Sequence, residues 1–182
     1  IDSILEQTHS NLELIITDDG SSDKTIEIIQ QYQENDKRIK LYQNEINLSF
    51  VKNFGKAISL CEGDYIALAD QDDMWKKDKL KVFLANIGEN VLIYSDSLVI
   101  DEYSSNLGKE YIRPKRDLVS GANNRAFLLG NCVSGNTMMF KKELLKYILP
   151  IENISFHDRW IVFVASTYGS ITFTDEAMTY YR

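Results

Sequence analysis

The sequence has little of several features that mark particular protein classes. Only two cysteines and two histidines occur among its 182 residues. Cys61 and Cys132 lack the spacing of a metal site, and so few cysteines fit a reducing compartment better than a disulfide framework. We expect both to be buried thiols. No second histidine lies at metal-ligand spacing from His157, so we expect His157 to be structural or substrate-facing and His9 to lie on the surface.

Long apolar runs and an excess of positive charge are also missing. No run approaches the ~20 apolar residues that span a bilayer, and no signal-type leader precedes the first expected helix. The 27 acidic and 20 basic residues give a net charge of −7, which argues against nucleic acid as a partner because such binders usually display a basic face. With 44% hydrophobic residues, the chain can build one buried core, so we expect one soluble domain over 1–182.

What the sequence does contain is a regular alternation of apolar and amphipathic segments. The first half predicts strands at 12–17, 38–42, 65–69 and 91–100, with helices at 24–34, 50–61 and 77–87. This βα alternation predicts an α/β fold with a doubly wound, parallel sheet. The rhythm changes after a long connection at 101–122, which we expect to be a mobile loop. The second half predicts helices at 123–129, 141–149 and 158–167, with strands at 133–140, 171–174 and 178–181.

Two acidic clusters follow apolar strands and carry the strongest functional signal. Asp18 and Asp19 follow one strand, and the run Asp70-Gln71-Asp72-Asp73 follows another. Because the carboxyl ends of parallel strands meet at one edge of a sheet, we expect these carboxylates to lie together. They would repel one another unless a cation joins them, and their oxygens suit Mg²⁺ or Mn²⁺ bound to a diphosphate. Each cluster could instead be a solvated turn that caps the next helix.

Two further polar segments lie in the second half. Asp158, in His157-Asp158-Arg159-Trp160, begins an apolar helix as either a cap or a general base. A helix N-terminus lowers the pKa of a carboxylate, so such a base would stay ionised at neutral pH. The segment 130–137 mixes small and amide residues and is either a tight connection or a set of groups that bond sugar hydroxyls. Trp75 and Trp160 fit packing better than stacking on a ligand.

Taken in this order, the motifs resemble the family 2 glycosyltransferases, which are inverting enzymes with the nucleotide-sugar-binding GT-A fold. The motifs are Ser3-Ile4-Leu5-x-Gln7-Thr8, Glu13-Leu14-Ile15-Ile16-x-Asp18-Asp19-Gly20-Ser21-Ser22-Asp23, 44–53, Gly63-Asp64-Tyr65-Ile66, Asp70-Gln71-Asp72-Asp73-x-Trp75 and His157-Asp158-Arg159-Trp160. The Asp-Gln-Asp-Asp-x-Trp form, with 135–140 and His-Asp-x-Trp after it, is most similar to bacterial rhamnosyltransferase-type members that build surface polysaccharides. The resemblance implies a Rossmann-like, mixed but mainly parallel sheet flanked by helices. It divides the domain into a nucleotide-sugar-binding half, 1–100, and an α+β acceptor-binding half, 101–182.

The resemblance also assigns roles to individual residues. Asp19 would contact the nucleotide base, and Lys52 would lie near the base or the phosphates. Asp70 would face the ribose or the metal, and Asp72 would bind Mg²⁺ or Mn²⁺ directly. Asp158 would deprotonate the acceptor hydroxyl as it attacks the anomeric carbon. The remaining assignments are Asp18 and Gln71 in the donor site, and Gly135, Asn136, His157 and Trp160 as acceptor or sugar contacts.

The implied donor is a nucleotide-diphosphate sugar of the dTDP-rhamnose or UDP-hexose type, and the implied acceptor is a glycan or a lipid-linked glycan. A lipid-linked acceptor would place a cytoplasmic enzyme at the inner face of the membrane, by peripheral association. The family's first strand would precede Ile1, and a histidine that often follows a pair like Tyr181-Arg182 is absent, so we expect the natural protein to continue at both ends. A non-catalytic nucleotide-sugar-binding module is the main alternative. A receiver-like phosphoacceptor domain fits less well, because it would end within ~120 residues.

Overall fold

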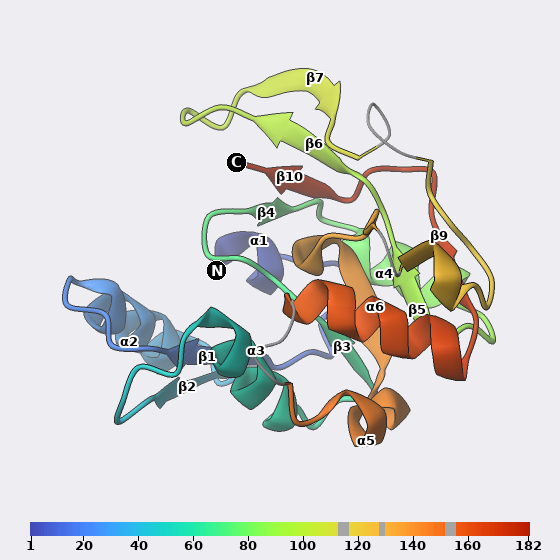
Figure 1. The fold of residues 1–182 in the computed structure, drawn as a ribbon. Helices are drawn as coiled ribbons and strands as arrows, with labels where there is room; N and C mark the ends of the chain where they lie inside the picture. The colour runs from blue at the N-terminus through green and yellow to red at the C-terminus, as the bar shows by residue number, and fades with distance from the viewer. Residues whose placement is uncertain (113–116, 128–129, 152–155) are drawn as a thin grey trace.

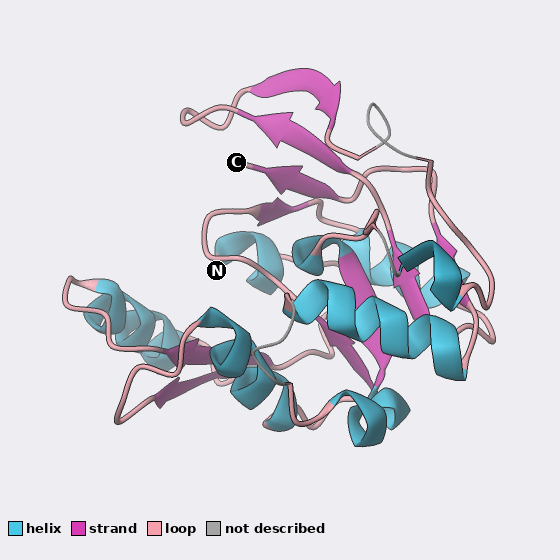
Figure 2. Cartoon of the chain, in the orientation of Figure 1, coloured by secondary structure: helices cyan, strands magenta, loops and turns pink. Residues whose placement is uncertain are grey.

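The computed structural model describes residues 1–112, 117–127, 130–151 and 156–182. Its helices are α1 (Asp2–Leu5), α2 (Thr25–Asn35), α3 (Phe50–Ser59), α4 (Lys79–Asn86), α5 (Leu145–Ile148) and α6 (His157–Tyr168), with 3₁₀ turns η1 (Asn124–Phe127), η2 (Gly135–Thr137) and η3 (Lys142–Leu144). The strands are β1 (Leu14–Asp18), β2 (Ile39–Gln43), β3 (Tyr65–Ala67), β4 (Met74–Trp75), β5 (Leu92–Tyr94), β6 (Ser97–Ile100), β7 (Asn106–Glu110), β8 (Met138–Lys141), β9 (Ile171–Phe173) and β10 (Thr179–Tyr181). Figure 2 colours these elements by type.

The strands form three sheets, in the orders β1-β2, β3-β8-β5-β9 and β4-β10-β6-β7. The predicted mixed α/β fold is confirmed, but antiparallel pairing is more prominent than the first half of the sequence suggests. The reason is that β8, from the second half, enters between β3 and β5 and runs antiparallel to both. The parallel pairs in the described residues are β1 with β2, β5 with β9, and β6 with β10.

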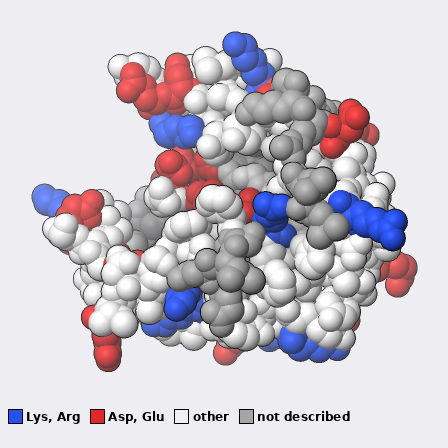
Figure 3. Space-filling model, viewed as in Figure 1, with Lys and Arg blue, Asp and Glu red and all other residues white. Residues whose placement is uncertain are grey.

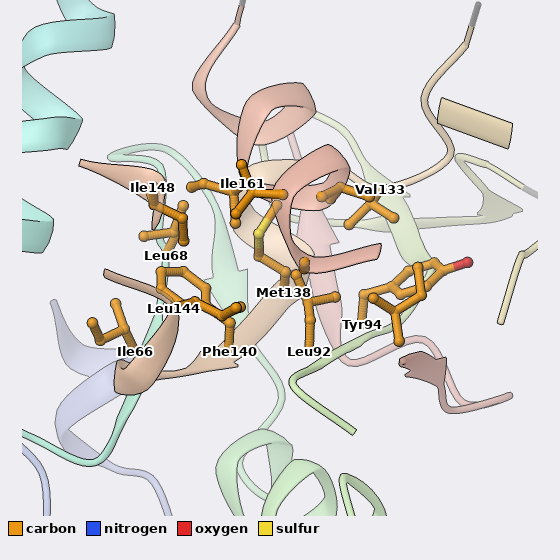
Figure 4. Close-up of a cluster of buried hydrophobic side chains, with 14 of the residues drawn as sticks. Ile66, Leu68, Leu92, Tyr94, Val133, Met138, Phe140, Leu144, Ile148 and Ile161 are labelled. Atoms are coloured by element: carbon orange, nitrogen blue, oxygen red, sulfur yellow. The ribbon is translucent and has the colours of Figure 1, made fainter. Parts of the chain in front are cut away.

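The β3-β8-β5-β9 sheet is buried on both faces, which the alternation of side chains explains. Met138 and Phe140 of β8 point into a cluster that includes Ile161 of α6, and this cluster is drawn in Figure 4. Met139, between them, points into a second cluster with Phe83 of α4. Successive strand residues face opposite sides of a sheet, so one strand contributes to both cores. Figure 1 shows α6 in front of this sheet and α4 behind it.

Two differences from the predicted elements matter for the site. The expected strand at 91–100 is divided into β5 and β6, which belong to different sheets. The buried Asp96 lies at the division, where its Oδ1 accepts backbone N–H bonds from Ser97 and Ile112. The expected loop at 101–122 contains β7, which pairs with β6. The resulting hairpin stands above the acidic loop before β4 (Figure 1).

The remaining differences from the predicted elements are confined to single segments. The helix predicted at 123–129 is the single 3₁₀ turn η1, with 128–129 outside the described residues, and the strand predicted at 133–140 begins as η2. The two-residue strand β4 was not predicted. Both cysteines are free, as expected, but Cys132 is buried whereas Cys61 is only partly so.

Candidate functional site

The loop between β3 and β4 carries the acidic residues that the sequence singled out. Asp70 is partly buried, and its pKa is raised to about 6 by burial and by the negative charges of Asp73, Asp72 and Asp158. Asp158 thus lies within electrostatic range of Asp70, although 87 residues separate the two along the chain. Figure 3 shows acidic side chains gathered beside a hollow in the surface on this side of the molecule. The fold therefore brings the acidic run that contains Asp70 and the predicted base Asp158 to one site.

Asp73 is held in place by residues from the second half of the chain. Its carboxylate accepts hydrogen bonds from the side-chain amide of Asn136 and, at 3.1 Å, from the backbone N–H of Arg182. Arg182 also donates from Nε to the backbone oxygen of Asp72 at 3.2 Å and from Nη1 to that of Glu102 at 2.7 Å. Arg182 therefore ties the acidic loop to the β6–β7 hairpin. Burial raises the pKa of Asp73, and the bonds from Asn136 and Arg182 oppose that effect.

Asp158 lies in the first turn of α6. Its Oδ2 accepts a 3.3 Å hydrogen bond from Nδ2 of Asn131, which also donates to the backbone oxygen of Val133 at 2.6 Å. The backbone N–H of Arg159 donates to Oδ1 at 2.6 Å. Burial raises the pKa of Asp158 despite that N–H bond. The expectation of a lowered pKa was wrong, because removal from water outweighs the effect of the helix N-terminus here.

A pocket opens beside Asp158. Its lining includes Asn131, Ser134, Phe156 and Arg159, from the segment before η2 and from the start of α6, together with Tyr111. The pocket thus combines amide, hydroxyl, aromatic and charged groups around a partly buried carboxylate. These groups could bind the hydroxyls of a sugar.

His157 and Gly135 pack directly against each other. The imidazole stacks on Phe54 with ring centroids 4.0 Å apart, and burial lowers its pKa to about 4, so the ring is neutral at pH 7. Neither ring nitrogen has a hydrogen-bond partner among the described residues. A Cβ at Gly135 would lie 2.9 Å from His157 Nε2, so a glycine is required at that position. Trp160 differs, because its Nε1 donates to the backbone oxygen of Ile148 at 2.8 Å and its ring packs against the core.

The two residues of the other acidic cluster, Asp18 and Asp19, have different roles. The carboxylate of Asp18 accepts backbone N–H bonds from Gly20 and Ser21 at 3.0 and 3.1 Å. These bonds lower the pKa of Asp18, although burial opposes them. Asp18 therefore forms the turn that the sequence pattern left open as the alternative to a cation site. Gly20 permits that turn because its φ of 97° suits glycine. Asp18 also lies at the carboxyl end of β1, opposite Gln43 of β2.

Asp19 points instead toward the segment before α3. Its Oδ1 accepts bonds from Asn44 Nδ2 at 2.9 Å and from the Leu48 N–H at 2.7 Å. Asn44 is fixed in turn by Asn53 and by Lys56, whose Nζ donates to Asn44 Oδ1 at 2.6 Å. Asp19 is therefore rigidly positioned. Two predicted donor-site residues, Lys52 on α3 and Gln71 in the acidic loop, have exposed side chains.

Several residues of this site were not among the predicted ones. Asn131 positions Asp158, Arg182 positions the acidic loop, and Lys79 is buried beneath that loop with no exposed surface. Asn131 lies within the segment 130–137 that the sequence did flag. Lys79 lies four residues before Phe83, on the buried face of α4, but the sequence does not show which groups it meets there.

The described residues contain no group of three or more His, Cys, Asp or Glu side chains that could hold a metal ion. Asp70 and Asp72 alone would leave most of the coordination sphere to oxygens of a ligand and to water, which is common for Mg²⁺ at diphosphate sites. Burial and the neighbouring carboxylates raise the pKa of Asp70, and a divalent cation would relieve the repulsion among these carboxylates. The donor set therefore fits Mg²⁺ or Mn²⁺.

Comparison with known proteins identifies the family. The glycosyl transferase family 2 profile matches residues 1–149. The chain belongs to glycosyl transferase family 2. Its relatives include an uncharacterized glycosyltransferase of Nostoc, 30% identical over 199 residues, with all of this chain and 59% of the relative covered. The teichuronic acid biosynthesis glycosyltransferase TuaG of Bacillus subtilis is 40% identical over 95 residues, 52% of this chain and 38% of that protein.

Solved structures show the same fold. Residues 1–349 of S. aureus TarS, in complex with UDP, superpose with a TM-score of 0.72 at 22% identity, covering 99% of this chain and 54% of that one. The predicted GT-A fold is therefore confirmed. The family 2 chain spans between about two fifths and three fifths of the length of these relatives. No described helix has both the length and the apolar character needed to cross a membrane.

Proposed function

We propose that this chain carries the donor site and the catalytic base of an inverting glycosyltransferase. The enzyme transfers a sugar from a nucleotide-diphosphate sugar to a hydroxyl of a glycan or lipid-linked acceptor in bacterial surface polysaccharide synthesis. One observation carries the proposal: Asp158 of α6 is close enough to the acidic loop for its negative charge to contribute to the raised pKa of Asp70. A candidate base and a candidate phosphate site thus share one edge of the fold. The names of relatives, which cite teichuronic and colanic acid biosynthesis, support the acceptor class.

The donor site would lie between the acidic loop and Asp19. Asp72 and Asp70 would hold Mg²⁺ or Mn²⁺, which when bound neutralises charge on the departing diphosphate. Asp19 would contact the nucleotide base, and its Oδ1 is already fixed by Asn44 and Leu48. The TarS structures hold UDP or UDP-GlcNAc, which favours a UDP-sugar as the first donor to test and dTDP-rhamnose as the second.

The transfer itself would use Asp158 as the base. The acceptor oxygen attacks the anomeric carbon from the face opposite the diphosphate, and its proton passes to the Asp158 carboxylate. The bond between the anomeric carbon and the phosphate oxygen breaks, and its electron pair leaves with the diphosphate. This displacement inverts the anomeric centre. A raised pKa makes Asp158 a stronger base once it is ionised, and the bond from Asn131 orients it.

A lipid-linked acceptor would place this reaction at the inner face of the cytoplasmic membrane. The division into a donor half, 1–100, and an acceptor half, 101–182, agrees with the proposal, since the pocket beside Asp158 is lined by residues after 101.

The substitution Asp158→Asn tests the proposal, because it removes the base and keeps the size of the side chain. We expect sugar transfer to fall roughly 10²- to 10⁴-fold, while manganese-dependent binding of the donor stays unchanged. The control is Asp64→Asn, which removes one exposed charge next to β3 and should change neither property. Equal loss of transfer and binding would contradict the assignment of the base. Donor binding without transfer in the unmodified protein would instead support a non-catalytic nucleotide-sugar-binding module.

A further inference from the structure

Lys79, the first residue of α4, is completely buried, with 0% of its surface exposed. A buried ammonium group is costly unless its donors are satisfied. Its Nζ donates to the backbone oxygen of Asn136 at 2.5 Å and to Oγ1 of Thr179 at 3.0 Å. It also lies 4.1 Å from the centroid of the Trp75 ring. Lys79 therefore joins α4 to η2, β10 and β4, directly behind the acidic loop.

These contacts favour the charged form of Lys79. An ammonium group has three donors and no acceptor, and here it meets a carbonyl, a hydroxyl and the face of an aromatic ring. Thr179 Oγ1 uses its own proton to donate to Asn136 at 3.2 Å, so it accepts from Lys79. A neutral amine would direct a lone pair at one of these electron-rich groups, and the ring face attracts cations. Burial lowers the pKa of Lys79 well below its usual value, although the charges of Asp73 and Asp70 oppose this. The carbonyl, the hydroxyl and the ring face are therefore the contacts that hold the ammonium form.

The charge of Lys79 acts on the acidic loop from behind. Its positive charge attracts the carboxylates of Asp70 and Asp73, which repel each other. Through Asn136 it also reaches Asp73 by hydrogen bonds, since the backbone oxygen of Asn136 accepts from Lys79 and the side chain donates to Asp73. Lys79 touches neither solvent nor the hollow where a donor would bind. It can act only through the residues of the loop.

We propose that Lys79 is a built-in counter-charge that weakens the binding of a free divalent cation at Asp70 and Asp72 until a diphosphate adds its own negative charge. This inference rests on the metal site of the proposed function. The ion and the lysine compensate the same carboxylates, so each reduces the gain from the other. The cation would then bind together with the nucleotide rather than ahead of it.

The substitution Lys79→Gln tests this role, because glutamine keeps a hydrogen-bond donor and removes the charge. The measurement is manganese binding to the purified protein at pH 8, followed by the electron paramagnetic resonance signal of free Mn²⁺, with and without UDP. We expect Lys79→Gln to bind free Mn²⁺ on the order of tenfold more tightly than the unmodified protein. Lys79→Met gives the same comparison if the glutamine variant does not fold.

Two controls separate charge from structure. Lys81→Gln removes an exposed charge from the same helix and should leave manganese binding unchanged. Asp73→Asn combined with Lys79→Gln removes the opposing charges together and should return the affinity close to that of the unmodified protein. Equal manganese affinity in a folded Lys79→Gln variant and the unmodified protein would overturn the role of Lys79 and leave the metal site standing. No manganese binding by any of these proteins, even with UDP, would overturn the metal site and this role with it.

Discussion

The substitution Asp70→Asn should stabilise the metal-free protein at neutral pH, although it removes a residue of the proposed donor site. Asp70 has a pKa of about 6 in the folded protein, against a usual value of 3.8, because of burial and the charges of Asp73, Asp72 and Asp158. Between these two pH values the unfolded chain has already lost the proton that the folded chain still holds. Stability therefore falls as pH rises through this window, and the full cost is present above pH 6. Asparagine resembles the neutral acid and avoids that cost.

The magnitude follows from the two pKa values. The difference between 3.8 and about 6 corresponds to roughly 3 kcal/mol as an upper limit. Part of the Asp70 side chain stays in contact with water, which screens the repulsion, so we expect a gain of about 1 to 2 kcal/mol. In a domain of this size such a gain raises the melting temperature by about 2 to 8 °C.

The assay is urea denaturation in EDTA at several pH values from about 4.5 to 8.5, followed by circular dichroism. Asp70→Asn should be more stable than the unmodified protein at pH 8, and the difference in stability should narrow as the pH falls below about 6. Asp64→Asn, at an exposed position, should give a difference near zero throughout. A variant that is equally or less stable than the unmodified protein at pH 8 would refute the idea that Asp70 is a crowded, destabilising carboxylate.

Two further predictions concern the other side of the site. Asn131→Ala removes the 3.3 Å hydrogen bond to Asp158 and should further raise the pKa of Asp158. The acidic limb of the pH–rate profile should then move to higher pH with donor binding unchanged, and an unmoved limb would contradict the positioning role of Asn131. Gly135→Ala places a Cβ 2.9 Å from His157 Nε2 and should cost about 1 to 3 kcal/mol of stability, measured by urea denaturation. His157→Ala in the same chain should relieve part of that cost, and no relief would show that the contact is not the cause.

The positions of helices and strands in the first half could be predicted because local pattern determines them there. The apolar residues before Asp18 and before Asp70 gave β1 and β3, and the amphipathic spacing gave α2, α3 and α4. The partners of these strands could not be predicted from the same patterns. β8 enters between β3 and β5 from more than 40 residues further along the chain, and no local signal encodes that pairing. The strand predicted at 91–100 likewise spans the change of sheet, which occurs at the polar triplet Ser95-Asp96-Ser97.

The acidic loop and Asp158 could be named from the sequence because carboxylates at strand and helix ends are conspicuous there. The pKa shifts of these carboxylates could not be predicted from the sequence, since they depend on burial by segments that are distant along the chain. Asp158 has a raised pKa despite its place at a helix N-terminus, and the carboxylate of Asp18 accepts a backbone N–H bond within its own turn. Lys79 was missed because its partners, Asn136 and Thr179, lie 57 and 100 residues away.

The most direct test of the account is a calorimetric screen of the protein against UDP-, dTDP-, GDP- and CMP-sugars, with Mn²⁺ and with EDTA. The account predicts that one nucleotide class binds, that binding requires Mn²⁺, and that Asp72→Ala abolishes it while Asp64→Asn does not. Binding that persists in EDTA or in Asp72→Ala would contradict a metal-dependent donor site at the acidic loop. Failure of every nucleotide sugar to bind the folded protein would contradict the donor site altogether.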